Sequence, residues 1–580
     1  MPGTLKRMLF CIPPELHEED ALQQCLAKHP EVKYVSLVGM DIVGHDTDEK
    51  IPVGLMLKSY ESFMRDGTQT DGSSVLLPGI ADISNARVDL IPDRDSYWFV
   101  DHNWDNLDEE TGLPVGTLRI PAILVHNSES EIGSRAILRD AEKVFKEGVV
   151  DALRSNPYVF EYLPFKSADE IEEICLTSAT ELEFYVKTPH EVADKVRLHT
   201  SQVMKEQYWK RTIGPVRTAL EKTLEILDCY GFEVEMGHKE VGGVKAEMTT
   251  EGFDHIMEQL EIDWKYADPM LASDRDNLAR YVIKDTFRRC GLDVTFLAKP
   301  VDGAAGSGKH THFGVVAKLK DGRKVNLFTA LDPDKDYLSP VGFGALMGLL
   351  KHYEIINPLA NASNASLNRI KPGYEAPVCI VTSLGQSIDV YSRNRTVLAG
   401  LIRDRRNPMA TRFELRSPHP KSNTYIVLAG GFLAMLDGIR KSLEASKTPA
   451  ELCASISKKY GEEDFYLERD REYRAENNIF EDYTQEEREK LFGKTPATVY
   501  ENVMAFETYP EKTKVLFEGG VMDERVLDSY KTAVLDLWAT ELHDRILPYA
   551  DASEKELVLE IRKALEQKDY KKTSKLQKKL

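Results

Sequence analysis

The stretch 411–420 reads T-R-F-E-L-R-S-P-H-P and places a charged side chain at every second position from Arg412. Arg412, Glu414 and Arg416 alternate with apolar residues. Successive side chains of a β-strand point to opposite faces, so a strand here carries all three charges on one face. Two guanidiniums beside a carboxylate suit a site that holds both a metal ion and phosphate oxygens. The alternative is a ladder of solvated surface charges, and this stretch alone favours that alternative.

Two other segments, far away in the sequence, repeat the pattern. Glu181 and Glu183 stand in T-E-L-E-F-Y-V, and His310 and His312 stand in K-H-T-H-F after a glycine-rich turn. Three such strands predict one pocket that is assembled from several strands. Carboxylates and imidazoles suit Mg²⁺ or Mn²⁺. No cysteine lies beside these pairs in the sequence, which argues against a thiolate zinc site. Two carboxylates about 4 to 5 Å apart repel by roughly 3 to 4 kcal/mol at an effective dielectric near 20, and a bound cation removes that cost.

The composition excludes several classes of protein. With 580 residues, 42% of them hydrophobic and 29% charged, the chain is typical of a globular protein with more than one domain. The net charge of -20 argues against general binding of nucleic acid or of anionic membranes. We therefore expect neither a nucleic-acid nor a membrane partner, whereas the net charge says little about small anionic substrates, because a local arginine cluster can override it.

The seven cysteines are scattered and form no C-x-x-C motif, which predicts reduced thiols and a cytoplasmic protein. The first residues lack the apolar run of a signal peptide, and no later segment reaches the roughly 18 apolar residues of a membrane span.

Periodicity predicts mixed strands and helices along the chain. The expected strands are 32–44, 51–57, 88–91, 117–125 and 293–298. The expected helices are 134–147, 217–230, 277–290, 342–355 and 425–446, and we expect Asp274 to cap the helix at 277–290. The acidic segment 101–116 is expected to be a loop. The basic end of the chain, 554–580, is expected to be a solvated, fraying tail, with an oligomer contact as the alternative.

The sequence resembles the glutamine synthetase family over about residues 30–480. The stretch N-R-I-K-P-G-Y-E-A-P at 368–377, after Asn357 and Pro358, is similar to the family's flexible glutamate loop. Further similar stretches stand in family order: D-G-S-S at 71–74, E-L-E-F at 181–184, K-E-V at 239–241, Q-L-E-I-D-W-K-Y-A-D at 259–268, G-S-G-K-H-T-H at 306–312, R-N-R-T at 393–396 and R-F-E-L-R-S-P-H-P at 412–420. The ordered set is far more specific than any one motif.

The resemblance implies an α+β fold. Residues 1–112 are expected to form an N-terminal β-grasp domain. Residues 113–580 are expected to form the catalytic domain, with a curved antiparallel sheet flanked by helices and a helical C-terminal extension. The family's stacked rings imply a homo-oligomer whose active sites lie between subunits.

The resemblance also implies a ligand set for two or three Mg²⁺ or Mn²⁺ ions in each site, with ATP as co-substrate. Glu183, Glu240 and Glu261 are similar to the ligands of the metal nearer glutamate. Those of the metal nearer ATP correspond to Glu181, His310 and Glu414. Glu247 lies at the usual short spacing from Glu240, but the context of Glu261 matches the family better, so residues 241–254 are expected to contain an insertion.

The resemblance assigns roles to other residues as well. Arg369 and Gly306 are expected to bind glutamate, while Arg403 is expected to contact nucleotide or phosphate. Tyr266, His312 and Arg412 are expected at ATP. Arg395 and Arg416 would steady the transferring phosphoryl group, and Glu375 would close the loop over the acyl phosphate. Asp71 would take a proton from ammonium in a pocket walled by Tyr208.

The implied activity is ATP-dependent ligation of ammonia to the γ-carboxylate of glutamate, through a γ-glutamyl phosphate. Two alternatives stay open: a γ-glutamyl ligase for another amine, and a non-catalytic structural or regulatory member. Some residues depart from the family pattern, and residues 382–389 look inserted. The departures are Ala305, Gly314, Met409 and Arg87, the last near an expected acidic position of the ammonium region.

Overall fold

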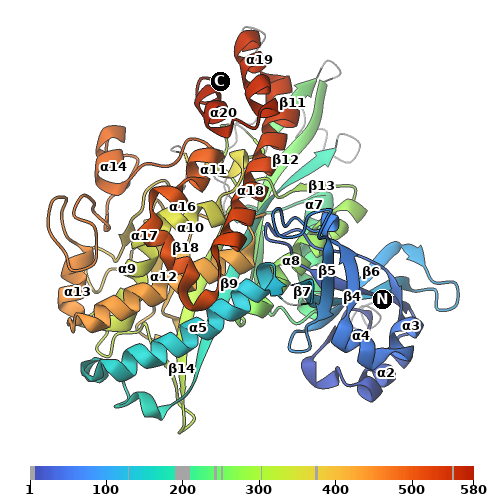
Figure 1. The fold of residues 1–580 in the computed structure, drawn as a ribbon, viewed down its shortest axis with the longest axis horizontal. Coiled ribbons are helices and arrows are strands. Elements are labelled where there is room, and N and C mark those ends of the chain that lie inside the picture. The colour runs from blue at the N-terminus through green and yellow to red at the C-terminus, as the bar shows by residue number, and fades with distance from the viewer. Residues whose placement is uncertain are drawn as a thin grey trace.

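A computed structural model describes residues 7–128, 130–189, 209–240, 245–249, 252–301, 303–371, 377–392, 394–550 and 554–580, with backbone only for residues 73, 245–249 and 252–255. The described chain combines helices with two separate open sheets. This architecture confirms the α+β class. In Figure 1 the first sheet, in blue, lies to one side of the larger second sheet and its helices.

The first sheet is built from short strands around one long strand, β7 (Pro114–His126). β7 pairs in parallel with β2 (Val32–Gly39) and antiparallel with its other partners. The remaining strands are β1 (Cys11–Ile12), β3 (Ile51–Pro52), β4 (Thr68–Asp71), β5 (Arg87–Pro92), β6 (Trp98–Leu107) and β8 (Ser130–Ile132). Since β7 and β8 belong to this sheet, it continues to Ile132, and a boundary at residue 112 would divide it; the division into domains stays a prediction.

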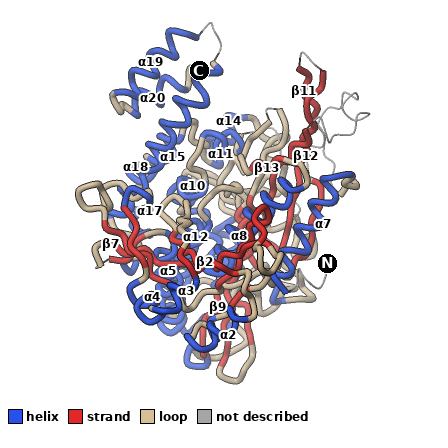
Figure 2. The backbone as a smooth tube through the Cα atoms, turned by 90° about the vertical axis from the view of Figure 1, so that its right-hand side faces the viewer, coloured by secondary structure: helices blue, strands red, loops and turns tan. Residues whose placement is uncertain are grey.

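The second sheet carries the residue pairs that the sequence analysis singled out. Its strands run in the order β10-β12-β9-β14-β18-β17-β16, and adjacent strands on this path are antiparallel except β16 and β17. Their bounds are β9 (Ile171–Pro189), β10 (Val234–Lys239), β12 (Gly252–Trp264), β14 (Lys309–Leu319), β16 (Thr382–Ser383), β17 (Ala399–Ile402) and β18 (Arg412–Leu415). Short strands pair at its edges: β11 (Lys245–Thr249) with β12, β13 (Asp293–Thr295) with β9, and β15 (Lys324–Asn326) with β14. Figure 2 shows β11 and β12 projecting together from the body of the molecule, and β11 with the first residues of β12 falls within the expected insertion 241–254.

Long helices pack beside this sheet. α12 (Thr424–Glu444) contacts both α9 (Pro340–Lys351) and α5 (Ser134–Ser155), and these three helices carry much of the buried core. The other long helices are α7 (Gly214–Cys229), α8 (Pro269–Arg289) and α18 (Glu524–Glu541). Shorter ones are α2 (Glu19–Ala27), α3 (Val53–Lys58), α4 (Tyr60–Asp66), α10 (Tyr353–Ala360), α11 (Asn364–Arg369), α13 (Pro449–Ile456), α14 (Gln485–Phe492), α15 (Val499–Val503), α16 (Ala505–Thr508), α17 (Pro510–Thr513), α19 (Lys555–Glu566) and α20 (Tyr570–Gln577).

Glycines let α9 and α12 approach closely. A Cβ atom added to Gly348 would lie 2.2 Å from the carbonyl oxygen of Ala434, and one added to Gly438 would lie 2.1 Å from that of Gly344. These distances are shorter than any real van der Waals contact, so the crossing requires residues without side chains.

A buried ion-pair network joins three of these helices to the first sheet. The Arg135 guanidinium in α5 bonds to Asp274 in α8 and to Asp93 after β5, and the Tyr425 hydroxyl in α12 donates to Asp274. Arg135 is 2% exposed. Removing one charged side chain of this network would leave its partner buried and uncompensated. The network therefore fixes the position of the first sheet relative to these helices.

Several expected elements differ from the observed ones. Residues 53–58 are a helix, because Pro52 ends the strand after two residues and the good helix formers Leu55, Met56 and Leu57 follow within the next turn. The acidic segment expected as a loop begins inside β6, which runs to Leu107. α8 begins at Pro269, with Asp268 as its N-cap, so Asp274 lies inside the helix.

The basic C-terminal segment is not a fraying tail. It forms α19 and α20, and Thr573, Ser574 and Leu576 of α20 are buried. The Ser574 and Thr498 hydroxyls bond at 2.7 Å, and Gln577 donates to Asn364. All seven cysteines are free thiols, as expected. None of the described helices combines the length and the apolar character that crossing a membrane requires.

Candidate metal and nucleotide site

Three buried glutamates from neighbouring strands meet in what we call the first cluster: Glu183, Glu240 and Glu261. Glu183 on β9 stands directly opposite Glu261 on β12. Glu240 follows β10, and its backbone N–H donates to the carbonyl of Gln259 on β12. One carboxylate oxygen from each glutamate lies within 4.8 Å of the others, so antiparallel register alone brings together residues up to 78 positions apart.

The second cluster is formed by Glu181, His310 and Glu414. His310 on β14 stands opposite Glu181 on β9. The His310 Nδ1 lies 3.0 Å from a carboxylate oxygen of Glu181 and 3.1 Å from one of Glu414, which comes from β18. Glu181 and Glu183 are alternate residues of one strand, so β9 contributes to both clusters and holds them side by side.

Neighbouring groups fix the orientation of these carboxylates. The Gln259 side-chain amide donates to Glu183 at 2.9 Å, and the Gly308 backbone N–H donates to the same oxygen at 2.7 Å. The Arg416 guanidinium donates to Glu414 at 2.6 Å. Such bonds hold ligand-type side chains in one geometry, as the outer shell of a metal site does.

The two clusters differ in electrostatics. Burial, together with the charges of Glu183 and Asp263, raises the pKa of Glu261 well above its ordinary value, and burial also raises the pKa of Glu183. In the second cluster burial opposes ionisation, but His312 and His310 hold the pKa of Glu181 well below its ordinary value, and Arg416 and His310 lower that of Glu414. The first cluster therefore lacks sufficient positive charge, and an all-oxygen set of this kind fits Mg²⁺ or Mn²⁺.

The structure adds two residues that the sequence analysis missed. His238 on β10 and Asp263 on β12 form a further group with Glu261. The His238 Nδ1 lies 3.0 Å from Glu240. Although burial opposes it, bonding to Asp263 and Glu240 raises the pKa of His238 to about 10. The signal was present, because His238 and Asp263 each stand two positions from a predicted ligand.

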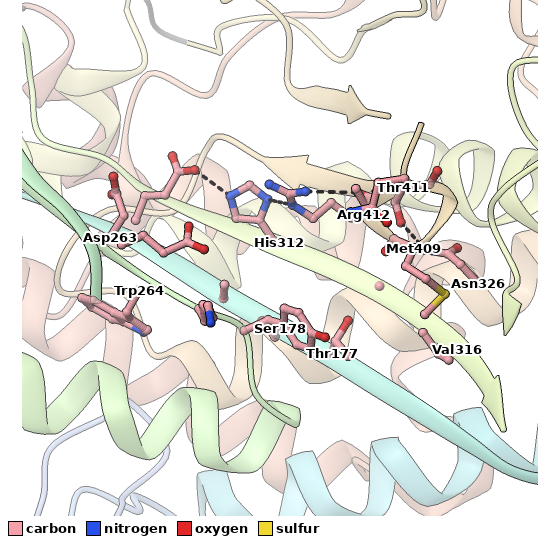
Figure 3. A pocket seen from close by; sticks show the side chains of 18 residues that line it. Thr177, Ser178, Asp263, Trp264, His312, Val316, Asn326, Met409, Thr411 and Arg412 are labelled. Atoms are coloured by element: carbon pink, nitrogen blue, oxygen red, sulfur yellow. Dashed lines mark hydrogen bonds and ion pairs between the residues drawn. The ribbon is translucent and has the colours of Figure 1, made fainter. Parts of the chain in front are cut away.

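A cavity of about 320 Å³ lies beside the second cluster (Figure 3). The three residues expected at ATP, namely Tyr266, His312 and Arg412, all line it, as does Glu181. The Arg412 Nε donates to the His312 Nδ1 at 3.1 Å, so the His312 Nε2–H donates to Glu181 at 2.9 Å. This chain of bonds runs from the second cluster into the cavity and offers donors to an anionic ligand.

Arg369 lies beside the first cluster, against the glycine-rich loop. A Cβ atom added to Gly308 would lie 2.4 Å from the Arg369 guanidinium, and one added to Gly306 would lie 2.7 Å from its Cγ. The guanidinium donates to the backbone carbonyls of Arg416 at 3.0 Å and Ser417 at 2.9 Å. Burial lowers the pKa of Arg369 to about 10, although the charge of Glu183 opposes this. The loop thus brings a buried cation next to the acidic cluster.

Other predicted site residues lie elsewhere. Asp71 ends β4 in the first sheet and is exposed. The Arg403 guanidinium lies over the rings of Tyr337 and Tyr391 and donates to a backbone carbonyl of the 382–389 segment. Arg395 is exposed in the loop before β17. Glu375, Tyr208 and the side chain of Glu247 lie outside the described residues.

Comparison with known proteins identifies the family. Residues 166–459, just over half of the chain, match the family model for the glutamine synthetase catalytic domain. This chain belongs to the glutamine synthetase family. Members of the family use ATP with Mg²⁺ or Mn²⁺, and the two clusters are this chain's candidate sites for those ions.

The relatives are divergent. The chain is 33% identical over 325 residues to a glutamine synthetase of Clostridium saccharobutylicum, a match that covers 55% of this chain and 58% of that protein. A match to the enzyme of Sulfolobus acidocaldarius covers 46% of the relative, so the chain spans about half the length of these curated relatives. A longer match, to the glutamine synthetase of Pyrococcus horikoshii, is 27% identical and covers 82% of this chain and 88% of that protein.

Solved structures share the fold. Glutamine synthetase of Plasmodium falciparum superposes with a TM-score of 0.65 at 18% identity, covering 93% of this chain and 98% of that one. A GmaS structure in complex with ADP superposes with a TM-score of 0.59, also at 18% identity and over 92% of this chain and 98% of that one.

Proposed function

We propose that this protein joins ammonia to the γ-carboxylate of L-glutamate, with ATP, through a γ-glutamyl phosphate. The observation that carries the proposal is the pair of clusters that share β9. The cavity lined by Arg412 lies beside the second cluster, and the buried Arg369 lies beside the first. Bound Mg²⁺ or Mn²⁺ would supply charge neutralisation for the phosphates and the attacking carboxylate. The protein's own residues would bind and orient the two substrates on either side.

On the nucleotide side, Tyr266, His312 and Arg412 would contact ATP in the cavity. Arg416 and Arg395 would steady the phosphoryl group as charge moves from the leaving oxygen to the attacking one. The Arg416 guanidinium bonds to Glu414 of the second cluster, and the Arg416 carbonyl accepts from Arg369. Arg416 therefore lies between the second cluster and Arg369.

On the glutamate side, Arg369 and the Gly306 backbone would bind the amino acid. Glu375 would close the site over the acyl phosphate, which would keep water from hydrolysing it. Asp71 would accept a proton from ammonium, Tyr208 would wall that pocket, and Arg403 would contact nucleotide or phosphate.

The decisive experiment measures phosphate release with ATP, Mg²⁺ and glutamate, and compares ammonium with a panel of primary amines. We expect release that requires both glutamate and ammonium, with glutamine as product by mass spectrometry. A protein that releases no phosphate under any of these conditions would be the non-catalytic family member.

Ligation of a different amine is the second candidate, and one observation favours it. Arg87 on β5 stands opposite Asp71 on β4, so a cationic residue, whose guanidinium pairs with Asp89, occupies the position opposite the carboxylate that would receive the proton of ammonium. In the same assay, release that requires a larger amine and is absent with ammonium would establish this second function instead.

We further propose a cytoplasmic homo-oligomer of stacked rings, with active sites between subunits. Light scattering coupled to gel filtration tests the assembly, and a monomer at micromolar concentration would exclude shared sites.

A further inference from the structure

A second cavity, of about 400 Å³, lies where α18 meets α11 and the loop between β18 and α12. It shares no lining residue with the cavity that contains Tyr266, His312 and Arg412. Its walls include the buried side chains of Leu359, Tyr530, Val534 and Trp538. Its volume is within the range of small-molecule sites, which are mostly apolar with a few placed polar groups. The polar groups of this cavity therefore decide what it binds.

Most of those polar groups already have partners. The Tyr530 hydroxyl donates to the carbonyl of Pro358, and the Trp538 Nε1–H donates to Asn364. Glu541 accepts from Asn364, Asp544 pairs with His543, and His45 pairs with Asp41. Ser363, Ser422 and Thr540 are likewise bonded within the protein. The unpartnered amide oxygen of Asn423 is sealed inside the protein and does not open to the cavity.

His419 is the exception in the interior of the cavity. It is 6% exposed, and its Nδ1 accepts the backbone N–H of Lys421 at 3.3 Å. That bond places the proton of the neutral ring on Nε2, for which the described residues provide no acceptor. A donor that faces an apolar cavity without an acceptor leaves a hydrogen bond unmade, so this N–H requires an acceptor from a ligand or water.

Two cations line the exposed part of the same cavity. The Lys421 ammonium and the Arg545 guanidinium form no ion pair with any described residue. Of the two acidic side chains that line the cavity, Glu541 accepts hydrogen bonds from Asn364 and Asp544 pairs with His543. Partial burial, together with the charges of Lys284, Arg545 and Arg280, lowers the pKa of Lys421, although the charge of Glu541 opposes this. The mouth therefore presents two cations that lack an ion pair, together with two carboxylates bonded to other residues, over an apolar interior.

We propose that this cavity binds a small organic acid, with its carboxylate between His419 Nε2 and the Lys421 ammonium and its apolar body against Trp538 and Val534. The carboxylate would satisfy the buried donor and the exposed cation together. An alcohol or amide of the same shape would leave the cation uncompensated.

The cavity lies next to the segments that hold Arg369. Ser363 and Ala365 of the α11 segment line it, and Arg369 is the last residue of that helix. His419 directly follows the carbonyls of residues 416–418 that accept from the Arg369 guanidinium. On the function proposed above, an acid bound here would change the affinity of the enzyme for glutamate, which makes the cavity an effector site.

Binding is tested first on the full-length protein without nucleotide or glutamate, by calorimetry with phenylacetate and with phenylacetamide as the neutral match. We expect phenylacetate to bind about tenfold more tightly than the amide, and Lys421→Gln and His419→Leu each to weaken its binding by about tenfold. Val534→Trp should abolish binding by filling the cavity. Leu559→Ser, on the exposed face of α19, is the matched surface control and should bind normally.

Equal affinity for acid and amide, or unchanged binding by Lys421→Gln, would overturn the proposed site. Lys421 is exposed, so this variant tests the site even where the buried substitutions impair folding. The coupling is tested separately by the glutamate concentration for half-maximal phosphate release, which we expect phenylacetate to change at least about twofold in the wild type and not in Lys421→Gln. Binding without that change would overturn the effector role, and binding by a protein that ligates no amine would refute the proposed function while leaving the site intact.

Discussion

At the scale of single residues, Glu414 links the second cluster to Arg416. It bonds to Arg416 and contacts His310, so its removal takes one carboxylate from a buried guanidinium and from a cluster imidazole. We expect Glu414→Ala to lower ligation by at least about a hundredfold, the cost of losing a major electrostatic contact in an active site. Steady-state phosphate release measures the loss.

The control for this substitution lies on the strand that both clusters share. Glu172 on β9 pairs with Lys318 on the surface, and exposed pairs contribute little to stability, so Glu172→Ala should keep full activity. Both variants should assemble as the wild type does. A fully active Glu414→Ala protein would exclude the ligand role of Glu414.

A second residue-scale prediction concerns pH. Because the pKa of Glu261 is raised, the metal-free folded protein holds a proton that the unfolded chain releases near the ordinary value of 4.5. Its free energy of unfolding should therefore fall as the pH rises above 4.5, and a bound cation should expel the proton. We expect Mn²⁺ to bind with proton release and to bind more weakly at lower pH.

Calorimetry in two buffers of different ionisation enthalpy measures the protons released per Mn²⁺. Glu261→Gln should remove the release that this carboxylate causes, whereas Glu172→Gln should leave it unchanged. Binding of Mn²⁺ to the wild type without any proton release would contradict the electrostatics of the first cluster.

Much of the candidate site was visible from residue alternation and family resemblance. The pairs Glu181 and Glu183, and His310 and His312, lie on strands, so period-two spacing fixed which faces they share. The choice of Glu261 over Glu247 was harder, because it depends on the register between β9 and β12, which are far apart in sequence. His238 was missed because a single histidine in a sequence does not indicate a metal site. Only the fold shows that Glu240 and Asp263 lie beside it.

At the scale of elements, the crossing of α9 and α12 gives a stability prediction. A methyl group at Gly348 would meet the backbone of Ala434, which has no room to move inside the core. We expect Gly348→Ala to lower the free energy of unfolding by about 1 to 3 kcal/mol, despite the better helix propensity of alanine. Chemical denaturation measures the change.

Gly54, in α3, is the matched control, since a Cβ atom there would meet nothing within 4 Å. Gly54→Ala should be neutral or stabilise by up to about 1 kcal/mol. If both alanine variants were equally stable, close helix approach would not be the reason for Gly348.

Element boundaries were predictable where one physical signal dominated. The helix at 217–230 was expected from its leucine stripe and from Gly231, and it was found within a few residues. β6 was missed because its second half, residues 103–107, is mostly exposed and polar, and composition alone suggests a loop. The docking of α20 was missed because its many lysines predict a solvated segment. A few buried side chains, Leu576 among them, nevertheless pack this short helix against the protein.

At the scale of the whole molecule, the candidate site and Asp71 belong to different sheets. The cluster residues lie on or next to strands of the second sheet, whereas Asp71 ends β4 of the first sheet and is exposed. The ion pairs of Arg135 join the first sheet to the helices of the same chain, which restricts how far Asp71 could move toward its own clusters. The proposed active sites between subunits would bring Asp71 of one chain to the clusters of the next.

Subunit mixing tests that arrangement directly. Asp71→Asn and Glu414→Ala should each abolish ligation alone, because each lacks one part of every site. If Asp71 acts on the neighbouring subunit, oligomers formed from equal amounts of the two variants contain sites with Asp71 from one chain and Glu414 from the next. Random assembly makes about a quarter of the sites intact, so we expect about a quarter of wild-type phosphate release from co-expressed variants. Mixing the two after separate assembly is the control and should restore nothing until subunits exchange, whereas co-expressed oligomers that remain inactive would place Asp71 and the clusters of one chain in the same site.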